Sequence, residues 1–135
     1  QNGGLFILQR RNGFMINAAE WLEEAGDDLK AAENLGQAKL YAAACFHCQQ
    51  AAEKALKAAV LKIRGTFPKG HSLRQLAEAA GLFEKAASEV SLLEGDYTLS
   101  RYPDAYGKPP RALYDSKAFA KRLDAARKIV KLVGE

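Results

Sequence analysis

Two cysteines and a histidine stand together in the sequence as Cys45-Phe46-His47-Cys48. A pair of cysteines two residues apart can perform thiol–disulfide exchange at the start of a helix, and with a histidine it can bind zinc. Here the motif lies inside a stretch that favours helix, where His47 points roughly 200° away from Cys45 at about 100° per residue. We interpret both cysteines as buried structural residues and expect no metal and no cofactor. The chain has no other cysteine, which favours a reduced, cytoplasmic setting.

A second group that could perform chemistry combines aromatic and basic residues between positions 97 and 114. Tyrosine rings can stack on a nucleobase, and arginine or lysine can hold a phosphate. The same combination is common at the rim of a protein interface, so both interpretations stay open. The group consists of Tyr97, Arg101, Tyr102, Tyr106, Lys108, Arg111 and Tyr114.

Arg101 is the central residue of this group. It lies at the end of an amphipathic segment, just before the Tyr102-Pro103 step, and its guanidinium could bind a phosphate, a nucleotide or a partner's carboxylate. Asp104 could form an Asx turn after the proline. His71 directly precedes a capping serine, so it could pack over a helix start or act as a base.

The stretch from Lys39 to Arg64 must position these residues. It contains no Gly and no Pro, and it is rich in residues that favour helix. Such a helix spans roughly 40 Å, enough to cross a small domain. Its apolar stripe predicts the spine of the core, and small or apolar residues on a second side predict a homodimer. Glu53, Lys54 and Lys57 predict a solvated face with internal ion pairs. The stripe comprises Tyr41, Cys45, Cys48, Ala52, Leu56, Ala59 and Ile63.

Other segments also carry helix signals. Asn17 with Glu20 predicts the start of a helix over 18–33 that stops at Asn34-Leu35-Gly36. Ser72 with Gln75 predicts a short helix over 73–80. An apolar stripe that begins at Phe83 and includes Tyr97 predicts one further helix, which ends at the step before Pro103.

The last part of the chain predicts a loop and a helix. Residues 104–114 contain one glycine and two prolines, which predict the loop, and Asp115 or Ser116 is expected to cap the final helix. Phe119, Leu123, Ala126, Val130 and Val133 are expected to face inward. No stretch alternates for long enough to predict a strand. The sequence therefore predicts an all-α, antiparallel up-and-down bundle of four to five helices.

Length and composition set the limits of this interpretation. A chain of 135 residues, 48% of them hydrophobic, is expected to form one domain with its own core. We assign this domain to residues 15–135 and interpret residues 1–14 as a leader or a disordered segment. No apolar run of about eighteen residues occurs, so we expect no membrane span. The net charge of +4 permits a nucleic-acid partner without requiring one.

Several short motifs, in this order, resemble the HEPN domain family of prokaryotes. They are the long-helix sequence YAAACFHCQQAAEKALKA, then His71-Ser72-Leu73 at the start of a short helix, and finally Ser100-Arg101-Tyr102-Pro103-Asp104 before the last helix. The resemblance covers residues 17–133. It implies a helical bundle, frequently a homodimer, that is encoded beside or fused to a minimal nucleotidyltransferase. In many members it also implies a metal-independent ribonuclease toxin.

The catalytic form of that family carries an arginine followed, after four to six residues, by a histidine. Arg101 matches the arginine, but the window after it contains no histidine. Tyr106 stands there instead, and a phenol is a poor base near neutral pH. The sequence therefore departs from the ribonuclease motif of the family it resembles.

Two functional classes remain open. The first is a nucleotide- or RNA-associated module, the partner of a minimal nucleotidyltransferase in a toxin–antitoxin or defence-type system. Its candidate ligand-binding residues are Arg101, Tyr102, Asp104, Tyr106 and His71. The second is a non-catalytic, dimeric protein-interaction module in which the Arg-Tyr-Pro-Asp sequence only fixes the exit of a helix.

Overall fold

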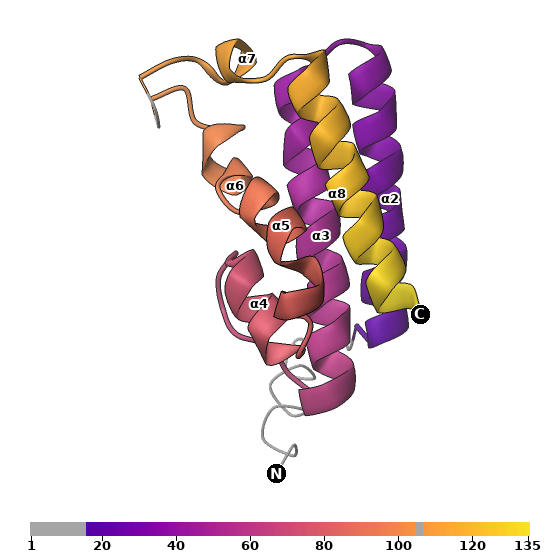
Figure 1. Cartoon of the computed structure of the whole chain (residues 1–135). Helices are drawn as coiled ribbons and strands as arrows, with labels where there is room; N and C mark the ends of the chain where they lie inside the picture. The colour runs from indigo at the N-terminus through magenta and orange to yellow at the C-terminus, as the bar shows by residue number, and fades with distance from the viewer. Residues whose placement is uncertain (1–15, 105–106) are drawn as a thin grey trace.

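This computed structural model describes residues 16–104 and 107–135. Helices are the regular secondary structure of these described residues. The predicted leader, 1–14, and Tyr106 lie outside these residues. In Figure 1 the chain runs up α2 (Ala18–Gln37), down α3 (Tyr41–Arg64), through α4 (Leu73–Ala79) and up α5 (Phe83–Leu93) and α6 (Asp96–Leu99). After α7 (Pro110–Leu113), α8 (Ser116–Gly134) runs down again. The predicted all-α antiparallel bundle is confirmed.

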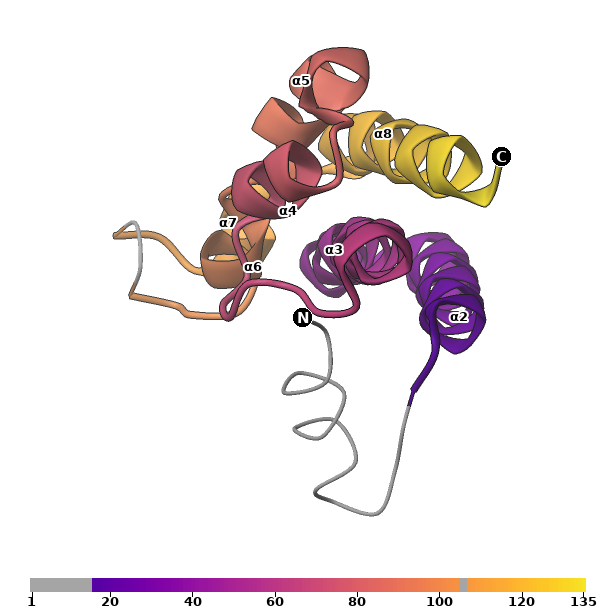
Figure 2. The same cartoon turned by 90° about the horizontal axis from the view of Figure 1, so that it is seen from below.

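α3 lies at the centre of this bundle. Viewed from below in Figure 2, α2 and α8 cover two of its sides, and α4 and α6 approach from another. Burial follows this arrangement, because Cys45, Cys48 and Leu56 are fully buried, whereas Ile63 in the last turn is 64% exposed. The chain's own helices therefore cover the second apolar side of α3. A second subunit is therefore not needed to cover that side of α3.

α2 begins where the sequence predicts and ends later. Asn17 and Glu20 form a reciprocal capping box at its start. The predicted stop at Gly36 is wrong, because the helix continues to Gln37 and Lys39 takes the left-handed conformation, with φ of 62°. Gly36 serves a different purpose, since a Cβ there would lie 2.3 Å from the Phe119 ring. Its missing side chain lets α8 pack closely against α2.

α4 has two caps at its N-terminus. The Ser72 side chain accepts a hydrogen bond from the Gln75 amide, as the sequence predicts. The carboxylate of Glu94, at the end of α5, accepts further hydrogen bonds from the amides of Leu73 (3.0 Å) and Arg74 (2.8 Å). Glu94 thus satisfies backbone donors that the start of a helix leaves free, and it ties α4 to α5.

The single helix predicted from Phe83 onward is two helices in the structure. α5 ends at Leu93, and α6 begins at Asp96 after a turn. The break brings the Asp96 carboxyl, which is 2% exposed, into the core. It leaves Tyr97 half-buried at the edge of the bundle. A local apolar pattern cannot reveal this break, because a distant partner stabilises it.

The predicted loop over 104–114 contains one turn of helix, α7, which begins at Pro110. Proline suits this position because the first residue of a helix needs no amide donor. Asp115, one of the two predicted caps, accepts a hydrogen bond from Ala118 and begins α8. The most deeply buried face of α8 is shifted from the predicted one and comprises Ala125, Ala126, Ile129 and Val133. Among the described helices, none combines the length and the apolar character needed to cross a membrane.

Two glycines in α2 provide a matched test of this packing. Gly36→Ala should lower the free energy of unfolding by about 1–3 kcal/mol, because the new methyl group overlaps the Phe119 ring. Gly26→Ala should raise it by about 0.5–1 kcal/mol, because its Cβ meets nothing within 4 Å and alanine favours helix. Urea denaturation of both variants measures the difference. Equal stability changes would contradict the close approach at Gly36.

Candidate functional site

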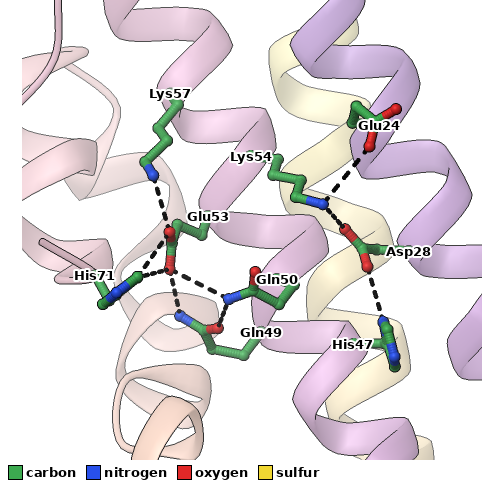
Figure 3. A network of polar contacts seen from close by, with 9 residues as sticks. All are labelled: Glu24, Asp28, His47, Gln49, Gln50, Glu53, Lys54, Lys57 and His71. Atoms are coloured by element: carbon green, nitrogen blue, oxygen red, sulfur yellow. Dashed lines mark hydrogen bonds and ion pairs between the residues drawn. The ribbon is translucent and has the colours of Figure 1, made fainter.

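A buried carboxylate in the middle of α3 is the starting point of the site. Glu53 is 3% exposed, and its oxygens lie 3.0 Å from the Lys57 ammonium and 3.0 Å from His71 Nδ1 (Figure 3). The Gln49 side-chain amide donates to it at 3.1 Å, and the Gln50 amide lies at 3.5 Å. A buried carboxylate requires such partners, because an unpaired charge there is costly. The prediction that Glu53 lies on a solvated face is therefore wrong, although its predicted pairing with Lys57 is present.

His71 extends this network to the surface. Its Nδ1 faces Glu53, while its side chain is 47% exposed and its ring stacks on Tyr97, with the ring centroids 3.8 Å apart. Because a carboxylate accepts hydrogen bonds, Nδ1 of His71 carries a proton and donates it to Glu53. Among the described residues, none forms a hydrogen bond with Nε2. The imidazole is therefore fixed on one side and available on the other.

Arg101 joins the same cluster from the end of α6. Its guanidinium carbon lies 4.8 Å from the Tyr97 ring centroid, 5.2 Å from that of Phe46 and 5.1 Å from that of Tyr102. Arg101 is exposed and has no carboxylate partner within the described parts of the chain. A guanidinium supported by aromatic rings but without a counter-ion keeps its donors free for an anion.

Lys57 is the cation that pairs with Glu53. Its ammonium lies 5.3 Å from the Trp21 ring centroid and 5.0 Å from that of Phe67, and these two rings meet edge to face. α2 and the loop after α3 supply these rings, so residues far apart in the sequence hold the lysine in place. The side chain of Lys57 is 13% exposed.

A separate buried network holds α6, and with it Tyr97 and Arg101. The Asp96 carboxyl accepts hydrogen bonds from the Tyr114 hydroxyl and from Arg122 Nε, both at 2.6 Å. Burial raises the pKa of Asp96, and hydrogen bonds from Tyr114 and Arg122 together with the Arg122 charge oppose this shift. The network joins α6 to Tyr114, which directly follows α7, and to Arg122 in α8. It therefore fixes the position from which Arg101 reaches the cluster.

A second carboxylate–histidine pair lies between α2 and α3, apart from the Glu53 network in Figure 3. Asp28 faces His47 Nδ1 at 2.8 Å and the Lys54 ammonium at 2.8 Å, and Glu24 lies 3.8 Å from that ammonium. No arginine and no stacked tyrosine accompanies this pair among the described contacts. It resembles the Glu53 network in chemistry, but not in surroundings.

The structure brings together only part of the predicted ligand-binding set. Arg101 and His71 both contact Tyr97, and Tyr102 contacts Arg101. Asp104 lies exposed beyond α6. Tyr106 lies outside the described residues. Tyr114, counted in the aromatic group, is instead buried against Asp96. Sequence reasoning missed the role of Glu53, although an acidic residue in an alanine-rich central helix was a usable signal.

The CxxC motif has the structural role that the sequence predicts. Cys45 and Cys48 are free thiols and fully buried, and His47 points to Asp28 instead. Burial raises the pKa of Cys45 to about 12, with the Asp96 charge adding to this effect. Burial likewise raises the pKa of Cys48. Neither thiol is poised for redox chemistry, which requires a lowered pKa.

The fold and this cluster define an all-α bundle with a cationic and aromatic site at the edge of its central helix. The family model of the HEPN domain matches residues 18–135. The chain belongs to the HEPN domain family, which confirms the resemblance seen in the sequence motifs.

Solved structures agree with this assignment. TT1696 from Thermus thermophilus is 36% identical, with a TM-score of 0.80, and the match covers 89% of this chain and 98% of that one. ST0689, described as an archaeal HEPN homologue, is 30% identical with a TM-score of 0.72, over 89% of this chain and 97% of that one. A HEPN domain protein from Thermotoga maritima is 27% identical with a TM-score of 0.64, over 84% and 93% of the respective chains. The comparison with curated proteins found no match.

The buried thiols give a direct test of the CxxC interpretation. In the folded protein at pH 8, a thiol-specific reagent should label Cys45 and Cys48 at least about 100-fold more slowly than in the urea-unfolded chain, because few thiolates form and burial blocks access. Mass spectrometry over time measures the labelling. Rapid labelling of either cysteine in the folded chain would contradict the structural role.

Proposed function

We propose that this protein is a nucleotide- or RNA-associated module of the HEPN family that holds a phosphate at Arg101. The observation that supports this most is the state of Arg101, an exposed guanidinium over three aromatic rings with no described acidic partner. Its planar donors fit a phosphate, and the rings of Tyr97 and Tyr102 offer stacking surfaces for a base. The exposed ring of His71 contacts Tyr97 as well.

A cleft lined by Ser100, the residue before Arg101, supports the same proposal. It has a volume of about 510 Å³ and lies between the start of α3, Ser100 and α7. Lys39 and Arg111 are its charged lining residues, and the rest of the lining is mostly apolar. A mostly apolar cleft with cations and no carboxylate suits an anionic ligand with a flat apolar part, such as a nucleotide.

The proposal includes a partner and a setting. The motifs imply a minimal nucleotidyltransferase as partner, within a toxin–antitoxin or defence-type system, and the two free thiols favour the cytoplasm. Co-purification with a nucleotidyltransferase encoded beside this chain tests the partner. The alternative, a non-catalytic dimeric interaction module, would use Arg101 only to pack against Phe46, Tyr97 and Tyr102.

Two substitutions at Arg101 separate these functions. Arg101→Ala and Arg101→Lys should each weaken binding of single-stranded RNA by at least about tenfold, because lysine lacks the planar fork. The melting temperature should barely change. Fluorescence anisotropy at fixed salt measures the affinity, since phosphate contacts depend on salt.

Arg74 provides the matched control. It is also an exposed arginine over an aromatic ring, with its guanidinium carbon 4.5 Å from the Phe83 centroid, but it pairs with Glu78. Arg74→Ala should leave RNA affinity unchanged. If both Arg101 variants bind RNA as the parent does, the assignment of a phosphate site to Arg101 is wrong.

We also propose that the protein forms a homodimer. The enclosure of α3 removes the first reason for this proposal, so the support is the family resemblance and the exposed apolar surface of Tyr102, which is 44% exposed. Light scattering at micromolar concentration should give about twice the mass of the 14.7 kDa chain. Tyr102→Glu should shift the equilibrium to monomer, whereas Ile63→Glu, at the far end of α3, should not. A strict monomer would contradict the proposal.

A further inference from the structure

The cleft between the start of α3 and α7, at the upper end of the bundle in Figure 1, has a wall that is already fixed. Its volume is about 510 Å³, and the buried residues Ser100 and Tyr114 form part of its lining. Both hydroxyls donate hydrogen bonds to Asp96, Ser100 to the backbone carbonyl and Tyr114 to the carboxyl group. A ligand that fits this wall therefore does not have to order it, which favours binding.

The lining of the cleft offers few hydrogen bonds to the body of a ligand. An exposed leucine, Leu40, and two prolines belong to it, and the hydroxyl protons of Ser100 and Tyr114 are already used by Asp96. Polar groups on the body of a ligand would lose water there without gaining partners. An apolar body therefore fits the cleft at least as well as the base and ribose of a nucleotide do.

Two cations give the cleft its sign. Lys39 and Arg111 line it and are exposed, and no carboxylate of the described residues pairs with either of them or lines the cleft. α3 also begins there without a side-chain cap, so the partial positive charge of its first turn adds to theirs. An anion with an apolar body therefore complements the cleft in both charge and polarity.

We infer that this cleft is a binding site for a small aromatic carboxylate. The planar fork of Arg111 matches a carboxylate, and Lys39 adds a second cation. The rings of Tyr41 and Tyr114 in the lining can pack against an aromatic body. The inference goes beyond the proposed function, because Arg101 is not among the residues that line the cleft.

The test compares two probes of nearly equal shape, 2-naphthoate and the uncharged 2-naphthamide, by isothermal titration calorimetry with the full chain. The parent protein should bind 2-naphthoate at least about tenfold more tightly, because only the carboxylate forms charge-assisted hydrogen bonds with the two cations. AMP should displace 2-naphthoate only at a higher concentration than 2-naphthoate itself needs to fill the site, because the base and ribose find few partners.

Substitutions in the lining place the probe. Lys39→Gly removes a cation without straining the backbone, because Lys39 has a φ of 62°, a conformation that favours glycine. Combined with Arg111→Gln, it should lower the affinity for 2-naphthoate to that of 2-naphthamide and leave the affinity for 2-naphthamide unchanged. Ala43→Phe should weaken both probes, because Ala43 lines the cleft and is exposed, so a ring there fills the cleft without disturbing the core.

Lys62 supplies the matched control, since it is an exposed lysine in the last turn of α3, at the other end of the helix from the cleft. Lys62→Gln should bind both probes as the parent does. An unchanged affinity for 2-naphthoate in the double variant of Lys39 and Arg111 would place the probe elsewhere and overturn the site.

The remaining outcomes separate this inference from the proposed function. If RNA binds but 2-naphthoate binds no more tightly than 2-naphthamide, the inference is wrong and the RNA function stands. If AMP binds the cleft more tightly than 2-naphthoate, the cleft belongs to the nucleotide function and the inference is again wrong. If 2-naphthoate binds as expected and RNA does not bind, the proposed function fails and the inference stands.

Discussion

The enclosure of α3 by helices of its own chain is the constraint on which the rest of the structure depends. A helix with neighbours on several sides can carry only small or well-partnered side chains there, since protein interiors are densely packed. The alanines of α3 satisfy this requirement and let α2 and α8 approach closely. Buried alanines include Ala44, Ala51, Ala52, Ala55 and Ala58. Gly36 meets the same demand for close approach between α2 and α8.

Because α3 is enclosed, two buried carboxyl groups connect segments that lie far apart in the sequence. Glu53 is buried by the packing around α3, so it gathers Lys57, Gln49 and His71 and thereby fixes the loop after α3. Asp96 has the same function for α6, which it joins to Tyr114 and Arg122. Such pairs add little net stability compared with apolar packing, but breaking one leaves an uncompensated charge. They therefore determine where α6 and the loop after α3 lie.

The site forms at the surface, where the segments held by these two carboxyl groups come together. One positions His71 and the other positions α6, so the rings of His71 and Tyr97 stack and Arg101 lies over Tyr97. The result is an exposed cation and an imidazole that contact the same tyrosine ring, on segments that buried acids hold in place. This arrangement leaves a guanidinium free to hold an anion, and it lies in a fold that belongs to the HEPN domain family. The cysteine motif, which first suggests redox or zinc chemistry, only fills the core.

The sequence by itself determined the elements that depend on local physics. Periodicity marked α3, and the short-range caps at Asn17, Ser72 and Asp115 marked helix starts, because each depends on residues within one turn. The family motifs carried the fold and pointed to Arg101 and His71. Local patterns could not show the break between α5 and α6, since it is stabilised by Arg122, far away in the chain.

Only the tertiary structure decided which polar residues are buried and which meet. Glu53 looked solvated because Lys54 and Lys57 follow it in the sequence, but packing buries it and His71 from the loop after α3 pairs with it. Gly36 looked like a helix stop because its contact with Phe119 comes from another helix. His71 and Arg101 are separated in sequence by three helices, and their common contact with Tyr97 arises from packing. Long-range packing selects among side-chain environments that the local sequence leaves equally open.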